Sequence, residues 1–485
     1  MAQSSMERNP FSITALPFFL ATVALFCAGC SLLEPEMPPG PSVPESYRLK
    51  GPQAISVLSE TDDWWRRFND PVLDRLMEEA FSGNLDLQQA LFRLEEAEAK
   101  VKKANATLWP RLDLSFERGR VGHGNITDNA YQYSLAASYE VDVFQRLRAY
   151  RRQRELERLA TRQDVKSVLL TLSAQIANTY FKILESRERI GLQQFIIGEL
   201  ERTLELVRLR YSRGLVSSLD VYQADQNLQA NRAALPLLQQ ELETNKNALA
   251  VLLGLPPSEL FPPGGGDKLF GKEMGRRLPE MEFRFDPGTP ADIISLRPDV
   301  REAYLRLEAQ NREVAQALAE LLPRFDITAA YGGENFESRN LFDYENVFWN
   351  IFAQVSQPLF RGGELRAEVE VQRSKLHQAA AAYQAAVLRA LREVEDALAA
   401  QDASRRNLDY LKDRLESLKS STKISVFRYR YGLSDFLPVL QAQTAYQSVA
   451  QEIVKMKYMV ISNQIGLVRA VGGRWMDRTV DGLIR

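Results

Sequence analysis

The sequence is poor in the two residue types from which most metal and nucleophilic sites are built. Among 485 residues there are two cysteines and two histidines, and His123 and His377 lie 377 − 123 = 254 positions apart. Few residues are therefore available to build a zinc site or a histidine-based catalytic relay. We expect no cofactor and no enzyme of these classes. An excess of one charge is also missing, because 61 lysines and arginines stand against 63 aspartates and glutamates. This balance excludes a typical nucleic-acid-binding protein.

An uncharged run near the N-terminus predicts a secreted chain. Residues 11–28 carry no charge, which fits the apolar core of a signal peptide and is marginal for a membrane span. The run ends in Ala-Gly-Cys-Ser and resembles the bacterial lipobox, whose cysteine becomes the acylated first residue of the mature chain. We therefore expect a signal peptide over residues 1–29 and a lipid on Cys30, with an ordinary signal peptide as the alternative. The proline-rich residues 30–44 predict an extended spacer.

The rest of the chain is two versions of one unit. A Tyr-x-x-Gly-Leu motif at residues 211–215 recurs at residues 429–433, an offset of 429 − 211 = 218. A period of this length is far too long for a solenoid, so each copy is a structural half of its own. The predicted division is a first repeat over 45–254, a linker over 255–297, a second repeat over 298–470 and a C-terminal tail over 471–485.

Apolar residues three and four positions apart predict long helices. In the second repeat they form a heptad seam, a row of core-facing positions, made of Val439, Ala442, Tyr446, Val449, Ile453, Met456 and Val460. Residues 145–210 and 363–428 contain no proline and predict helices of about 66 residues, on the order of 100 Å long at a rise of about 1.5 Å per residue. Globular domains do not contain such helices, so a coiled-coil tether is one candidate function.

Alternation of apolar and polar residues predicts four strands between the helices. They cover about 111–120, 131–143, 324–334 and 347–357, each with one apolar face, as in a transmembrane barrel or a half-buried soluble sheet. Open sheet edges are not stable in lipid, and bacterial barrels begin at about eight strands. Other copies of the chain must therefore complete the barrel. Two copies would leave no lumen, whereas three give twelve strands.

A set of motifs stands in a fixed order between about residues 60 and 475. The motifs are Trp64-Trp65, Asp70-Pro71, Leu296-Arg297-Pro298-Asp299, Pro358-Leu359-Phe360-Arg361-Gly362-Gly363 and Val471-Gly472-Gly473-Arg474-Trp475. Together they resemble those of the TolC-like outer-membrane factors, in their NodT/OprM-like lipoprotein branch. The resemblance implies a mainly helical fold with a transmembrane β-barrel, in a homotrimer of the outer membrane that extends into the periplasm. It also implies export by an inner-membrane pump of the resistance-nodulation-division class, reached through a periplasmic adaptor protein.

The resemblance also assigns roles to residues at the helix tips. It implies that Gly214-Leu215 and Gly432-Leu433 meet the adaptor, and glycine accepts the left-handed conformation that a tight helix end needs. It places the periplasmic constriction of the pore on the helix that carries Leu437 and Gln441, with Asp435 one turn earlier.

A hydrogen-bonded latch is implied at the same level of the molecule. Tyr429 and Asp220 match its positions, with Tyr429 as the donor, while Ser434 stands where many members have an arginine. The alternative for Asp220 is a simple role as the N-cap of its helix.

Two other functions stay open on the sequence alone. A periplasmic tether would explain the heptads and the lipid anchor but not the four strands. An enzyme ranks third, because candidate acids such as Glu95, Glu96 and Glu98 resemble a solvated helix face. The chain has no Gly-x-x-x-x-Gly-Lys-Ser/Thr loop, so energy for export would come from the pump.

Overall fold

A computed structural model describes residues 36–48, 55–56, 63–123, 126–262, 277–280, 285–286 and 288–484. The chain divides into two compact units. We call residues 1–40, 94–161 and 302–384 the strand unit, and residues 41–93, 162–301 and 385–485 the tip unit. Each unit combines parts of both sequence repeats. Cys30 and the predicted signal peptide lie outside the described residues.

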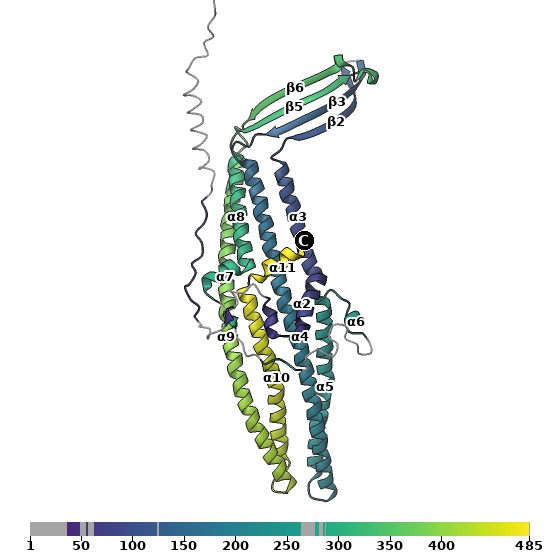
Figure 1. Cartoon of the computed structure of the whole chain (residues 1–485), viewed down its shortest axis with the longest axis vertical. Helices are drawn as coiled ribbons and strands as arrows, with labels where there is room; N and C mark the ends of the chain where they lie inside the picture. The colour runs from purple at the N-terminus through teal and green to yellow at the C-terminus, as the bar shows by residue number, and fades with distance from the viewer. Residues whose placement is uncertain are drawn as a thin grey trace, which may run out of the picture. The chain divides into compact units, whose positions relative to one another are not determined.

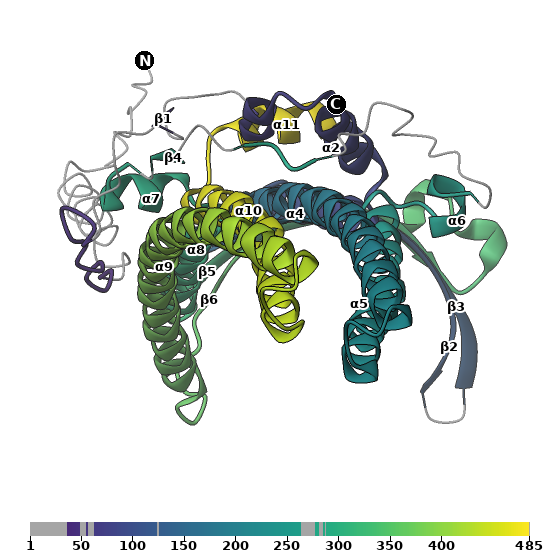
Figure 2. The ribbon, with the colours of Figure 1, turned by 90° about the horizontal axis from the view of Figure 1, so that it is seen from below.

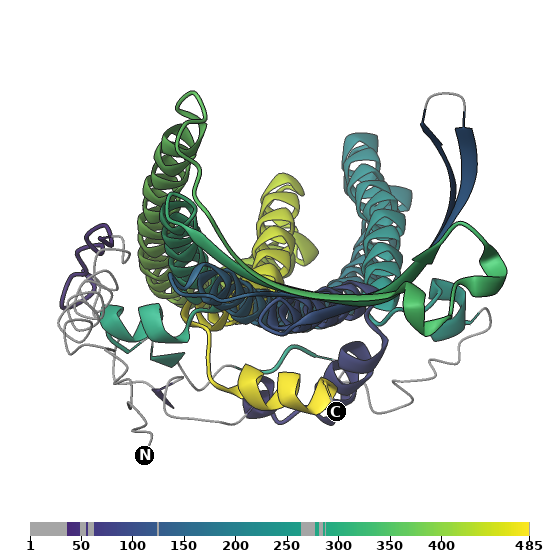
Figure 3. The ribbon, with the colours of Figure 1, turned by 90° about the horizontal axis from the view of Figure 1, so that it is seen from above.

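The strand unit contains the four predicted strands in one antiparallel sheet. They are β2 (Arg111–His123), β3 (Ile126–Glu140), β5 (Arg324–Asn335) and β6 (Val347–Ser356), side by side in the order β2-β3-β5-β6 (Figure 1). Two short 3-10 helices, η2 (Ser338–Asn340) and η3 (Tyr344–Asn346), lie between β5 and β6. The sheet is curved when it is seen from above (Figure 3). Within the described residues, the outer edges of β2 and β6 have no partner strand.

The two faces of this sheet differ in polarity, although Val121 and Phe352 are exposed on the more polar one. The register pairs Leu114 with Leu135, Leu135 with Tyr331 and Tyr331 with Trp349, so these four side chains share one face. Each of them is exposed, from 41% for Leu135 to 73% for Trp349. Exposed apolar residues that follow the same register are Leu112, Phe116, Ile327, Ile351 and Val355. The monomer therefore leaves a broad apolar sheet face uncovered.

The predicted strand bounds need correction in the first repeat. The β2–β3 ladder continues to the pair His123 and Ile126, so both strands extend further than predicted, because backbone pairing continues through polar residues. At its other end β3 stops at Glu140 rather than 143. The carboxylate of Asp142 accepts hydrogen bonds from the amides of Leu147 (3.0 Å) and Arg148 (2.9 Å). These bonds start the next helix and end the strand.

The helices of the two repeats have matching lengths, as the duplication predicts. Helices α3 (Leu85–Ala106) and α8 (Pro298–Ala319) have 22 residues each, α4 (Arg146–Ser212) and α9 (Glu364–Arg430) have 67, and α5 (Ser218–Leu252) and α10 (Leu437–Val471) have 35. The two long helices predicted from the absence of proline are thus confirmed. Within the described part of the chain, no helix combines the length and apolar composition needed to cross a bilayer.

In the strand unit, apolar side chains hold the helix segments together. Leu156 and Ala160 of α4 pack on Leu305 and Ala309 of α8. A second cluster joins α8 to α9 through Leu307, Val314, Leu376 and Ala380. These contacts fix the helix ends from which the strands begin and to which they return.

In the tip unit, α4 with α5 and α9 with α10 form two antiparallel hairpins, which lie next to one another (Figure 2). The unit also holds η1 (Trp64–Phe68), α2 (Pro71–Gly83), α6 (Pro257–Leu260), α7 (Pro290–Leu296) and α11 (Trp475–Leu483). A short parallel pair joins β1 (Ile55–Ser56) to β4 (Phe285–Asp286). The Trp64-Trp65 motif serves packing, because the Trp65 ring lies 5.1 Å from that of Trp475, centroid to centroid, and all three tryptophans are buried.

Candidate functional site

The predicted tip residues lie where α4 turns into α5 and where α9 turns into α10. Each long helix ends in a Schellman motif, in which two amides beyond the helix bond back to carbonyls of its last turn. The four bonds are Gly214 N to Tyr211 O (2.8 Å), Leu215 N to Arg210 O (3.0 Å), Gly432 N to Tyr429 O (3.0 Å) and Leu433 N to Arg428 O (2.8 Å). The duplication therefore extends to individual hydrogen bonds.

Both tip glycines adopt the backbone conformation that the sequence predicted. Gly214 has φ +69° and Gly432 has φ +72°, the left-handed region that residues with a Cβ adopt only with strain. Leu215 and Leu433 follow them with exposed side chains. Each tip thus presents an exposed leucine on a fixed turn.

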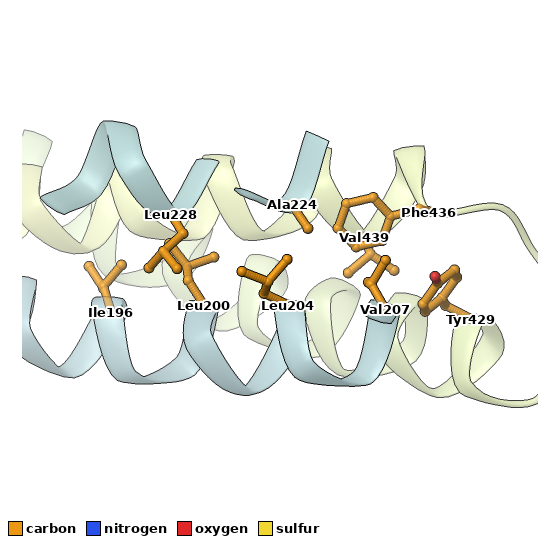
Figure 4. Close-up of a cluster of buried hydrophobic side chains, with 9 residues drawn as sticks. All are labelled: Ile196, Leu200, Leu204, Val207, Ala224, Leu228, Tyr429, Phe436 and Val439. Carbon is orange, nitrogen blue, oxygen red and sulfur yellow. The ribbon is translucent and has the colours of Figure 1, made fainter. Parts of the chain in front are cut away.

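An apolar cluster packs the two hairpins against each other just behind the tips. Figure 4 shows its nine buried side chains, with Tyr429 at one end. They come from α4 (Ile196, Leu200, Leu204, Val207), α5 (Ala224, Leu228), the end of α9 (Tyr429) and the start of α10 (Phe436, Val439). The first and second repeats therefore share one core at this level.

Tyr429 closes one end of this core (Figure 4), but the predicted hydrogen bond to Asp220 is not formed. Its ring is 2% exposed and lies 5.3 Å from the ring of Phe436, centroid to centroid. Among the described residues, the Tyr429 hydroxyl has no hydrogen-bond partner. Asp220 instead accepts a hydrogen bond from Ser217 Oγ (3.2 Å). Ser217, and not Asp220, occupies the N-cap position of α5, so the simpler alternative for Asp220 is also wrong.

An arginine that the sequence analysis missed makes the contact with Tyr429. The guanidinium carbon of Arg210, near the end of α4, lies 4.6 Å from the centroid of the Tyr429 ring. Its Nη1 also donates a hydrogen bond to the Tyr429 carbonyl oxygen. A signal was available, because Arg210 and Arg428 occupy equivalent positions, 428 − 210 = 218 residues apart, just before the tip motifs.

Electrostatics keep the Tyr429 hydroxyl protonated. Burial raises the pKa of Tyr429, the negative charge of Asp220 raises it further, and Arg210 partly offsets both, which leaves a pKa of about 12. The side chain is therefore neutral at physiological pH, and its ring face is available to a cation.

The predicted constriction residues lie along the start of α10. Leu437 is its first residue and Gln441 follows one turn later, both with exposed side chains, while Asp435 is exposed just before the helix. Phe436 and Val439 are buried in the cluster. Leu437 and Gln441 therefore point away from the core that the hairpins share. Among the residues that the structure describes, no group of three or more His, Cys, Asp and Glu side chains is placed to hold a metal ion.

Comparison with known proteins identifies this architecture. A sequence profile of outer membrane efflux proteins matches residues 76–255 and 289–473, most of the chain and a part of each repeat. The chain belongs to the outer membrane efflux protein family. As a member of this family, the chain is an outer-membrane component of an efflux system. Membership therefore favours a transport function over a tether or an enzyme.

Individual relatives match this efflux protein over nearly its whole length. The pyoverdine export outer membrane protein OpmQ of Pseudomonas aeruginosa is 28% identical, covering 94% of this chain and 97% of OpmQ. Outer membrane protein OprJ of the same species is also 28% identical and covers 97% of both chains. The crystal structure of the CmeC outer membrane channel of Campylobacter jejuni superposes with a TM-score of 0.84 over 93% of this chain and 98% of CmeC. At 21% identity that likeness shows the fold, which includes a helical part and a barrel part.

Proposed function

We propose that three copies of this chain form a passive exit duct through the outer membrane. The observation that carries the proposal is the four-stranded sheet with one exposed apolar face and, in the part of the chain that the structure describes, two edges without a partner strand. Lipid would cover the apolar face, and pairing β2 of one copy with β6 of the next would satisfy both edges. Three sheets give a barrel of twelve strands, wide enough for a lumen.

The proposed partners are a periplasmic adaptor and an inner-membrane pump of the resistance-nodulation-division class. Membership in the efflux family implies an adaptor and a pump, and the pump class is our inference. The adaptor would dock on the tips at Gly214, Leu215, Gly432 and Leu433. Their exposed leucines and fixed turns support this assignment.

The closed end of the duct would be formed by the exposed start of α10. Leu437 would supply an apolar ring that stops ions by dewetting. Asp435 and Gln441 would line the same constriction, and Asp435 would supply its negative charge. Pro438 and Gln441 lie in the first turns of α10 and carry no charge. Cation selectivity would therefore depend on Asp435.

Reconstitution of the purified protein tests the duct itself. The trimer in a planar lipid bilayer should produce discrete single-channel currents, small at rest because the tips are closed. Asp435→Asn should lower the preference for cations over anions, whereas Asp396→Asn, at an exposed position of α9 remote from the tip, should leave it unchanged. Protein that inserts into the bilayer without conducting would contradict the proposed function.

The lipid anchor requires a separate experiment. We propose that Cys30 is acylated after removal of residues 1–29, on the strength of the sequence Ala28-Gly29-Cys30 after an uncharged run. Cells given labelled palmitate should label the wild-type chain and not Cys30→Ala. Cys27→Ala is the matched control, because it removes the other cysteine and should leave labelling intact. Equal labelling of wild type and Cys30→Ala would exclude this site.

A further inference from the structure

The two hairpins of one chain are joined at their tips by Arg210. The residue belongs to α4, in the first repeat, whereas the ring and the carbonyl that it contacts belong to Tyr429 of α9, in the second. We propose that Arg210 is a positioning residue that clamps the second tip against the first and thereby holds the duct closed. The inference rests on the proposed function, since it assumes that separation of the tips opens the pore.

The chemistry of the contact suits a clamp. A guanidinium over an aromatic ring is attracted to the negative charge of the ring face. Its hydrogen bond to the Tyr429 carbonyl is charge-assisted, and that carbonyl lies in the last turn of α9, where the helix dipole favours a cation. The same oxygen also accepts from Gly432 N at 3.0 Å, which uses both of its lone pairs. One side chain of the first repeat thus holds the helix end of the second repeat through two contacts, one with the ring and one with the carbonyl.

The surroundings make this contact specific to arginine. The Tyr429 ring is held by Phe436 and the apolar cluster that bury it, so its position does not depend on Arg210 alone. Lysine would keep the charge but lose the planar group that lies on the ring while it reaches a carbonyl. The equivalent arginine of the second repeat, Arg428, is exposed. The clamp therefore uses an arginine of the first repeat and has no counterpart made by Arg428 of the second.

A clamp and a hydroxyl latch predict opposite results for one substitution. The clamp uses the ring and the main-chain carbonyl of Tyr429, and the hydroxyl makes no hydrogen bond within the described residues. Tyr429→Phe retains both groups that Arg210 contacts, so it should leave the closed state unchanged. Tyr429→Leu removes the ring and should loosen the tips. A latch through the Tyr429 hydroxyl would instead make Tyr429→Phe leaky.

Single-channel recording of the full-length protein in planar bilayers measures the closed state directly. Loss of the clamp in Arg210→Gln should increase the fraction of time spent in open states by about tenfold, the effect of losing one charge-assisted hydrogen bond. Arg210→Lys should give an intermediate value. In the double variant Arg210→Gln/Tyr429→Leu the two effects should add to less than their sum, because both changes remove the contact between guanidinium and ring. Arg428→Gln is the matched control and should behave as wild type.

The outcomes separate this inference from the proposed function. A wild-type protein that never conducts contradicts the duct itself. A conducting wild type with an unchanged Arg210→Gln, or with Tyr429→Phe as leaky as Arg210→Gln, overturns the clamp. Circular dichroism and the size of the assembly should be unchanged in every variant, which distinguishes a looser tip from a misfolded chain. If Arg210→Gln does not fold, the Tyr429→Phe variant decides between the two models. Currents of this variant equal to those of the wild type support the clamp, and larger currents refute it.

Discussion

Arg297 is a buried cation whose charge is matched by two carboxylates. Its Nε and Nη2 donate to Asp299 at 2.9 and 2.7 Å, and its Nη1 donates to Glu393 at 2.7 Å and to the Ala470 carbonyl at 2.9 Å. It is 6% exposed. Burial alone would raise the pKa of Asp299, but the hydrogen bonds and charge of Arg297 outweigh burial and hold that pKa below its usual value. The residue therefore ties α8 to α9 and α10 within the tip unit.

Arg297→Ala should destabilise the protein by about 2 kcal/mol, because it breaks charge-assisted hydrogen bonds to two carboxylates that are themselves 43% and 36% exposed and stay partly hydrated. The pKa of Asp299 is depressed in the folded state, so its contribution is present above about pH 4 and is lost as the pH falls through the folded pKa. Thermal unfolding in detergent at pH 7 and pH 3, followed by circular dichroism, should show a deficit for Arg297→Ala that shrinks at the lower pH.

The matched control for this prediction is Arg392→Ala. Arg392 is exposed and lies 3.8 Å from an exposed Asp396, so its loss should cost less than about 1 kcal/mol. Equal melting temperatures for wild type and Arg297→Ala at pH 7 would contradict the assigned role.

Sequence reasoning located the tip residues but not their partners. Gly214 and Gly432 were predictable because a left-handed helix end requires a residue without a Cβ. The bond from Tyr429 to Asp220 was carried over from a resemblance, and it is not formed here. The direction of a long side chain such as Arg210 depends on how two helices approach each other. That approach is a tertiary property that a motif does not contain.

At the scale of the elements, the sheet is the part most dependent on its surroundings. Its apolar face is exposed in the monomer and would be stable only against lipid or another protein. Residues on the opposite face, such as Ser115, Glu117 and Gln132, are polar. Neighbouring positions of one strand therefore lie on an apolar and on a polar face in turn.

Leu114→Lys should prevent stable membrane insertion, whereas Glu117→Lys on the same strand should be tolerated. A lysine on a lipid face near the bilayer midplane costs about 2 to 4 kcal/mol, but a residue on the opposite face would lie in the aqueous lumen. The measurement is the amount of each variant that fractionates with the outer membrane. Equal amounts would show that this face does not meet lipid.

The alternation of side chains predicted all four strands, and heptad spacing together with long stretches free of proline predicted the helices. Both signals are local, so a single sequence contains them. The ends of β3 were predicted less well. Its start depends on backbone pairing with β2 and its end on the cap that Asp142 gives to α4. Neither this pairing nor this cap can be recognised in the pattern of apolar residues.

At the scale of the whole molecule, the four-stranded sheet predicts the number of chains, because the edges of β2 and β6 have no partner strand among the residues described. Native mass spectrometry of the protein released from a mild detergent should give three times the mass of the mature chain. Chemical crosslinking in intact membranes should give a ladder that ends at the same number, so that detergent cannot create or hide the assembly. A dominant mass of one or two chains would rule out the twelve-stranded barrel.

The equal helix lengths also limit how this protein can change in evolution. One residue inserted into a helix rotates everything beyond it by about 100°, which would carry core positions such as Val449 and Ile453 of α10 away from their partners. Seven residues restore the direction to within about 20° and add about 10 Å. Because α4 packs with α5 and α9 with α10, an added heptad must be matched in the neighbouring helix and in the other repeat. Hairpin length in such a protein should therefore vary in discrete steps, with intermediate lengths absent.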